Sequence, residues 1–148
     1  MKIVINGCFD LLHKGHKKLI NTALKYSDSG KVLLLMNSDK SIAALKGDRR
    51  PLEHISLRSE NIQKVIDDYQ RKTMEYPRLS VRIFDTEKEL AEIIDEFEPD
   101  MIIKGDDRPD VREIIGYGKW PILFIPTVRD KKGKKISTTE IAKERGLL

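Results

Sequence analysis

The sequence has a single cysteine, Cys8, among its 148 residues. One cysteine excludes an internal disulfide and any zinc site built from several cysteines, and it favours a reducing compartment. No apolar run approaches the roughly 20 residues that span a membrane, and the N-terminus begins with a strand-like segment in place of a signal peptide. We therefore expect a cytoplasmic protein with no membrane partner.

Aromatic residues are also scarce, at 6% of the chain, and they are not interleaved with basic residues as in a stacking platform for nucleic acid. The formal net charge of +4 indicates anionic ligands of some kind. We therefore expect no nucleic-acid partner, although a binding module whose basic loops grip RNA or DNA stays open as an alternative. The length suits one domain, covering residues 1–148, with a real core.

Short apolar runs alternate with longer helical patterns along the chain. The predicted strands cover residues 2–6, 31–36, 80–84, 100–104 and 121–125. The predicted helices cover residues 15–26, 39–45, 56–74, 87–97, 110–117 and 137–145. This alternation predicts a doubly wound, Rossmann-like α/β domain with a five-stranded parallel sheet. Its ligand site should lie at the carboxyl ends of the strands, where the strand order reverses.

The segment 7–16, Gly-Cys-Phe-Asp-Leu-Leu-His-Lys-Gly-His, joins the first predicted strand to the first predicted helix. A helix start offers free backbone N–H groups and a positive dipole end to a phosphate. Gly15 allows close approach, and His13 and His16 lie three apart, where both can donate to one anion. A metal site with Cys8 and Asp10 as further ligands, or a plain solvated helix start, would fit the same residues.

The decapeptide resembles the signature of the cytidylyltransferase-like nucleotidyltransferases, and Ile-Ser-Thr-Thr at 136–139 resembles the second signature of that family. The resemblance implies that an acceptor phosphate attacks the α-phosphorus of a nucleoside triphosphate and that pyrophosphate leaves. It also implies Mg²⁺ bound with the triphosphate, no metal held by the protein itself, and a homodimer. His13 and His16 would be catalytic. The first signature would bind the nucleotide through Gly7, Cys8, Phe9, Asp10 and Gly15.

A third stretch, residues 37–51, resembles the matching loop of the bacterial heptose-phosphate adenylyltransferases. By that resemblance Lys46 is catalytic and reaches the reacting phosphates, as a mobile point charge can. Arg49 and Arg50 could grip an acceptor phosphate, and Arg58 matches a family arginine that we also assign to the acceptor. Helix capping at Ser38 and simple solvent exposure of Arg49 and Arg50 are the alternative interpretations.

Two segments near the C-terminus complete the predicted nucleotide site. The family places a Gly-Asp turn at the end of the fourth strand, so Asp106 should approach the nucleotide, although Gly-Asp-Asp is also ordinary turn chemistry. Ser137, Thr138 and Thr139 should hold the β- and γ-phosphates, while Ser-x-x-Glu also reads as a helix capping box. The family's arginine before this signature is displaced, and Arg129, Lys132 or Lys134 would substitute for it as a triphosphate contact.

Together these residues predict a nucleotidyltransferase that moves CMP or AMP from CTP or ATP to a sugar, polyol or alcohol phosphate. A different class of function is a metal-dependent hydrolase built on Cys8, Asp10, His13 and His16. Neither this hydrolase nor a nucleic-acid-binding module would release pyrophosphate from a nucleoside triphosphate and an acceptor, which separates them from the transferase.

Overall fold

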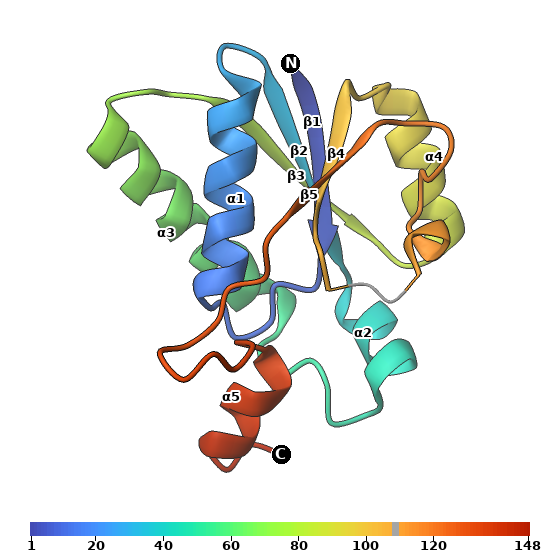
Figure 1. The fold of residues 1–148 in the computed structure, drawn as a ribbon. Helices are drawn as coiled ribbons and strands as arrows, with labels where there is room; N and C mark the ends of the chain where they lie inside the picture. Colours follow the sequence, from blue (N-terminus) through green and yellow to red (C-terminus); the bar gives the residue numbers. More distant parts are fainter. Residues whose placement is uncertain (108–109) are drawn as a thin grey trace.

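The computed structural model describes residues 1–107 and 110–148 (Figure 1). Its centre is a five-stranded parallel sheet with strand order β3-β2-β1-β4-β5. The strands are β1 (Lys2–Gly7), β2 (Lys31–Asn37), β3 (Arg78–Phe84), β4 (Met101–Gly105) and β5 (Ile122–Ile125). The chain winds outward from β1 to β3 and then crosses to β4, so the order reverses between β1 and β4. The predicted doubly wound parallel sheet is confirmed.

Helices cover both faces of the sheet. Figure 1 shows two helices, α1 (Lys14–Ser27) and α3 (Ile55–Thr73), on one face, and α4 (Glu87–Phe97) on the other. The short helices α2 (Asp39–Lys46) and α5 (Thr138–Glu144) lie beyond the carboxyl ends of the strands. Within the described residues, no helix combines the length and apolarity needed to cross a bilayer.

Strand β1 is buried on both faces, which explains its continuous apolar run. Ile3 and Ile5 pack with Ile20 of α1 in one core cluster, whereas Val4 points to the opposite face and packs with Leu90 of α4. The alternation follows from the period of two along a strand. The sheet is therefore fixed between two apolar layers, and its loops are left to form a site.

The predicted helix at 110–117 is wrong. The structure has only a 3-10 turn, η1 (Val111–Glu113), followed by further turns. Gly116 and Gly118 adopt φ angles of 99° and 79°, which a right-handed helix cannot accommodate. A Cβ at Gly116 would also lie 2.6 Å from Ile102 Cδ1. The other predicted elements are present, with ends that differ by at most two residues.

Replacing Ile20, which has 0% exposed surface in the α1 layer, with alanine should lower the free energy of unfolding by about 2–5 kcal/mol. The matched control is Asn21→Ala, at the next, exposed position of α1, which should change it by less than about 0.5 kcal/mol. Urea denaturation of both variants measures the difference. Equal losses would contradict this packing of α1.

Candidate active site

His13 and His16 cap the start of α1 together. His13 is the N-cap residue, and its Nδ1 accepts a hydrogen bond from Gly15 N at 3.0 Å. His16 Nδ1 accepts from His13 N at 3.2 Å, and the two rings stack with centroids 3.8 Å apart. Because each Nδ1 is an acceptor, the neutral rings carry their hydrogen on Nε2. Both histidines therefore keep an Nε2–H donor for a ligand.

Both imidazoles are held in the neutral form. Burial, and then the positive charge of Lys135, lower the pKa of His13. Burial lowers the pKa of His16 to about 3, with further contributions from His13 and Lys46. The rings can donate hydrogen bonds to phosphate at neutral pH without first losing a proton.

The turn before α1 is strained and closely packed. Phe9 and Leu11 are buried and adopt φ angles of 53° and 47°, which cost non-glycine residues about 1–3 kcal/mol each. The Phe9 ring lies 5.4 Å from the His16 ring, between centroids. At Gly15, a Cβ would approach His13 Cε1 to 2.9 Å, so glycine makes room for the imidazole. Other contacts must hold this turn in place.

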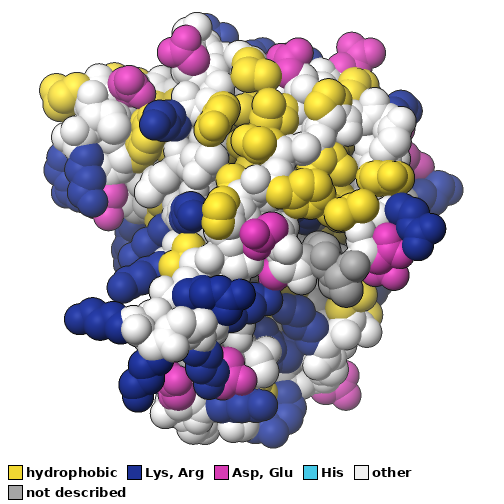
Figure 2. Space-filling view, in the orientation of Figure 1, with side chains coloured by type: hydrophobic (Ala, Val, Ile, Leu, Met, Phe, Trp, Pro, Cys, Tyr) yellow, Lys and Arg dark blue, Asp and Glu magenta, His cyan; other side chains and the backbone are white. Residues whose placement is uncertain are grey.

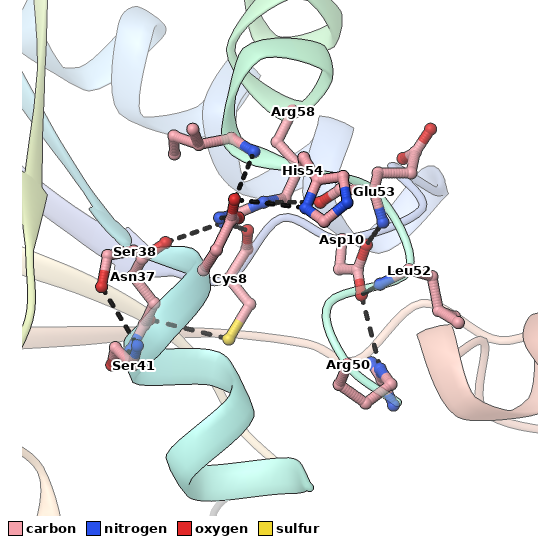
Figure 3. Close-up of polar contacts among 12 residues, drawn as sticks. Cys8, Asp10, Asn37, Ser38, Ser41, Arg50, Leu52, Glu53, His54 and Arg58 are labelled. Carbon is pink, nitrogen blue, oxygen red and sulfur yellow. Dashed lines mark hydrogen bonds and ion pairs between the residues drawn. The ribbon is translucent and has the colours of Figure 1, made fainter. Parts of the chain in front are cut away.

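The carboxylate of Asp10 supplies those contacts (Figure 3). It accepts hydrogen bonds from Leu52 N and Glu53 N, both at 2.9 Å, and from Arg50 Nε at 3.4 Å. Asp10 is 1% exposed, so these charge-assisted bonds replace its contact with water. The carboxylate therefore ties the first signature to the loop after α2, and this side chain does not supply the nucleotide contact that was predicted for Asp10.

Arg58 is a second buried tie in the same region (Figure 3). Its Nη1 donates to Cys8 O and Asn37 O, both at 2.8 Å, and its Nε donates to Glu53 O at 3.0 Å. Its Nη2 donates to Asp39 Oδ1 at 2.7 Å. Burial alone would raise the pKa of Asp39, but this hydrogen bond, together with the one from Ile55 N, the charge of Arg58 and the contact with His54, outweighs it, and the pKa is lowered. Contrary to the predicted acceptor contact, Arg58 has no exposed surface and belongs to the scaffold of the site.

The two signatures lie side by side although 128 residues separate the atoms that join them. Thr138 Oγ1 donates to Asp10 O at 2.8 Å. Ser137 accepts from Glu140 N at 3.2 Å and caps α5, which confirms the predicted cap. Lys135 forms an ion pair with Asp107 at 2.7 Å, which anchors the segment before the second signature to the end of β4.

A cavity of about 330 Å³ lies between the signatures, and we call it the first cavity. Both histidines, Lys46 and residues 137–139 line it. Gly7, Phe9 and Gly15 of the first signature also border it, as do Lys104 and Lys135. Lys104 is 8% exposed, and its Nζ lies 3.5 Å from Asn6 O. The structure therefore brings most of the predicted catalytic and nucleotide-binding residues to one place.

A second cavity of about 450 Å³ adjoins the first. Its walls include Cys8, the end of β2, residues 84–87 before and at the start of α4, and residues 113–115. It shares several lining residues with the first cavity: Asn6, Gly7, His16, Lys46, Lys104 and Thr138. Two ligands could therefore meet across one shared wall that holds an imidazole and two ammonium groups.

Some predicted contacts lie elsewhere. Asp106 accepts hydrogen bonds from the Thr127 hydroxyl and from Thr127 N. These bonds, the hydroxyl first, lower its pKa, and Asp106 does not line the first cavity. Arg129 donates to Gly133 O within its own hairpin and does not line it either. Lys104 and Lys135 do, and the sequence analysis did not assign them. Lys104 could have been found from the sequence, because it is a charged residue directly after the apolar run of β4, at the end of the sheet where the site lies.

The positions of Cys8, Asp10 and the histidines do not fit the alternative of a metal centre. Cys8 Sγ is 3.6 Å from Asn37 Oδ1, and the Asp10 carboxylate is bound by the loop after α2. In the part of the chain that the structure describes, no group of three or more His, Cys, Asp or Glu side chains is placed to hold a metal ion.

The surface around the site is basic. Figure 2 shows Lys and Arg side chains gathered over its lower part, around α5 and the segment before it, while apolar side chains gather above. Exposed lysines of that segment are Lys131, Lys132, Lys134 and Lys135. This charge favours anionic ligands at the carboxyl end of the sheet.

The lowered pKa of His16 makes stability depend on pH. Because the folded-state pKa of about 3 lies below the ordinary value of 6.5, the unfolded chain binds more protons between these limits, and stability falls as the pH falls. Between pH 7 and 5 this residue alone should remove about 2 kcal/mol of unfolding free energy. His16→Asn keeps a cap acceptor without a titrating ring, so urea denaturation should show a loss smaller by about that amount. Identical losses would contradict a neutral, buried His16.

Known proteins with similar sequences point to one family. A sequence profile described as cytidylyltransferase-like matches residues 4–144. Bifunctional protein HldE of Geobacter metallireducens is 41% identical over 110 residues, covering 72% of this chain and 19% of that protein. HldE of Psychromonas ingrahamii is 32% identical over 144 residues, covering 95% of this chain and 27% of that protein. The chain therefore spans only about a fifth to a quarter of the length of these curated relatives.

Solved structures support the fold. A lipopolysaccharide core biosynthesis protein from Thermoplasma volcanium superposes with a TM-score of 0.55 at 18% identity, over 93% of this chain and 98% of that one. A universal stress protein from Archaeoglobus fulgidus gives a TM-score of 0.59 at 12% identity, over 84% and 93%. At such identities the likeness extends to the fold alone. The family profile, in contrast, spans both signatures, and this chain belongs to the cytidylyltransferase-like family.

Proposed function

We propose that the protein transfers a nucleoside monophosphate, CMP or AMP, from CTP or ATP to the phosphate of a sugar, polyol or alcohol phosphate. The observation that carries this proposal is the shared wall of the two cavities, where His16, Lys46 and Lys104 face both. A reaction between two phosphate-bearing substrates needs such a meeting place, with cations and hydrogen-bond donors on both.

The histidines stabilise charge and need not act as bases. An oxygen of the acceptor phosphate forms a bond to the α-phosphorus, and the bond from that phosphorus to the α–β bridging oxygen breaks. The Nε2–H groups of His13 and His16 donate to the phosphate oxygens on which charge builds up. Since both rings are neutral before the ligand binds, they serve as fixed dipoles held by the cap of α1.

Each substrate has a cavity whose chemistry suits it. Residues 125–128 and Leu19 give the first cavity an apolar part for a base, next to the hydroxyls of the second signature. The second cavity combines apolar walls with the carboxylates of Asp85, Glu87 and Glu113, which accept hydrogen bonds from sugar or polyol hydroxyls. The acceptor phosphate then lies at the shared, basic end.

Mg²⁺ fits as a companion of the triphosphate. Among the described residues that line the first cavity, Asp107 supplies the carboxylate, and it is paired with Lys135. Phosphate oxygens would therefore supply most of the ligands, and Asp107 would be the carboxylate available to hold the ion. When bound, the ion neutralises charge on the triphosphate.

The experiment that tests this function is a pyrophosphate-release screen. CTP, ATP, UTP and GTP are each combined with a panel of sugar, polyol and amino-alcohol phosphates in the presence of Mg²⁺. We expect release with CTP or ATP and one class of sugar or polyol phosphate. If no pair releases pyrophosphate, the proposal is contradicted, and the nucleic-acid-binding and hydrolase alternatives are favoured.

Lys46→Ala should lower kcat at least tenfold while changing the Kd of the nucleotide less, because the ammonium follows the phosphoryl group through transfer. Lys46→Arg should restore activity only in part, since a planar guanidinium does not replace a compact charge. Lys40→Ala, an exposed position earlier on α2, is the matched control and should keep full activity. Steady-state kinetics with the active substrate pair measures all three. Near-normal turnover in Lys46→Ala would remove this lysine from the mechanism.

A further inference from the structure

Strand β3 leaves one edge of the sheet free. It is the terminal strand of the order β3-β2-β1-β4-β5, and no other strand within residues 1–107 and 110–148 pairs with its outer side. All seven of its residues are in register with β2, so the outer side presents backbone N–H and C=O groups along the same length. A free edge of this kind can accept an added strand.

A groove of about 430 Å³ lies between β2, β3 and the end of α4, and we call it the basic groove. Lys2, Lys31 and Arg78 begin β1, β2 and β3 in register, so they form a row across the amino end of the sheet. Arg82 lies four residues after Arg78, on the same face of β3. All four line the groove, and among the described lining residues Glu96 supplies the carboxylate. The groove therefore carries a clear excess of positive charge.

Most of this charge has no counterion. The ammonium of Lys2 donates to Phe97 O and lies 4.6 Å from the centroid of the Phe97 ring. In contrast, Lys31, Arg78 and Arg82 are exposed and take part in none of the ion pairs in the described part of the chain. Lys31 and Arg78 are also direct cross-strand neighbours, where like charges are unfavourable. An acidic partner would relieve this repulsion.

The opposite face of β3 is apolar and partly uncovered. Val81 and Ile83 point to that face and are 40% and 47% exposed, although strands of a parallel sheet are usually buried on both faces. We propose that β3 binds an extended, acidic segment of another protein, which adds a further strand to the sheet. Every second side chain of that segment would be acidic and face Arg78 and Arg82, and those between would be apolar and pack beside Val81 and Ile83.

Charge favours such a partner over a second copy of this chain. Antiparallel pairing of two copies through β3 would place Arg78 and Arg82 of both copies on the same face of the joined sheet. Four guanidinium groups would then lie close together without added carboxylates, and their repulsion opposes the pairing. An acidic segment uses the same backbone groups and neutralises the arginines.

The position of the basic groove keeps it separate from the candidate active site. The amino ends of the strands lie at the opposite end of the sheet from α2 and α5 (Figure 1). The basic groove shares no described lining residue with the first or the second cavity. A segment bound along β3 therefore leaves both cavities open, and this inference does not depend on the proposed nucleotidyl transfer.

The test uses the acetylated and amidated peptide Glu-Val-Glu-Ile-Glu-Val-Glu as the probe in isothermal titration of the chain. The double variant Arg78→Glu/Arg82→Glu reverses the charge of the edge and should raise the Kd of the peptide about tenfold or more. Lys88→Glu makes the same kind of change at an exposed position of α4 outside the groove, and should alter the Kd less than about twofold. Thermal melting checks that each variant is folded. Arg82→Gln, a smaller change, decides the test if the double variant is not.

A second arm separates strand addition from simple attraction of charge. The same peptide with N-methyl groups on its central residues keeps every side chain and the net charge but cannot donate the backbone hydrogen bonds, so it should bind about tenfold more weakly or not at all. The unmodified peptide should also slow hydrogen exchange of the backbone amides in residues 78–84.

Three results would overturn the proposal. Equal binding of the N-methylated peptide, or an unchanged Kd in the folded variants, would show that β3 adds no strand through these contacts. No binding of the peptide by the wild type would leave the arginines as charges that only keep the free edge from aggregating. Binding of a DNA oligonucleotide in place of the peptide, lost in the same variants, would point to a nucleic-acid partner instead.

Discussion

The buried carboxylate of Asp10 is the contact on which the rest of the site depends. It holds two backbone N–H groups and Arg50 of the loop after α2, and its own main-chain oxygen accepts from Thr138. The turn around it contains two buried residues with left-handed backbone angles, which would relax without such ties. The cost of removing this carboxylate from water is offset because several donors that would otherwise be unpaired form hydrogen bonds with it. One residue thereby links both signatures and the loop after α2.

The histidine pair shows how one contact can serve both folding and chemistry. Each imidazole uses Nδ1 to satisfy a backbone N–H at the start of α1, where a helix leaves such groups without internal partners. That bond also fixes the tautomer and the ring orientation, so the remaining Nε2–H needs no further reorganisation when an anion arrives. Burial and nearby cations keep the rings neutral, which leaves the formal positive charge to the lysines.

The fold could be predicted from the sequence because its strands are short apolar runs that are easily told apart from the longer helical patterns. The alternation of these runs with helices then predicted the parallel sheet. It failed at 110–117, where a helix was predicted but Gly116, at positive φ, turns the chain. It predicted which motifs meet, yet it could not tell the direction of a side chain. Asp10 and Arg58 carry charges that normally mark a surface, and only the tertiary structure shows them turned inward. Lys104 and Lys135 reach the first cavity through the end of β4 and a hairpin whose geometry no local pattern specifies.

Lys46 lines both the first and the second cavity, and its local structure suits that position. It is the last residue of α2, so the helix fixes its main chain on one side, while Gly47 at φ 98° releases the chain on the other. In the proposed transfer, a long, exposed stem that ends in a compact charge can follow the phosphate charge without moving the scaffold. The buried Arg58, whose planar group is fixed by four hydrogen bonds, provides the opposite property. The proposed transfer uses both properties, because a binding wall must hold still while charge moves along the reaction axis.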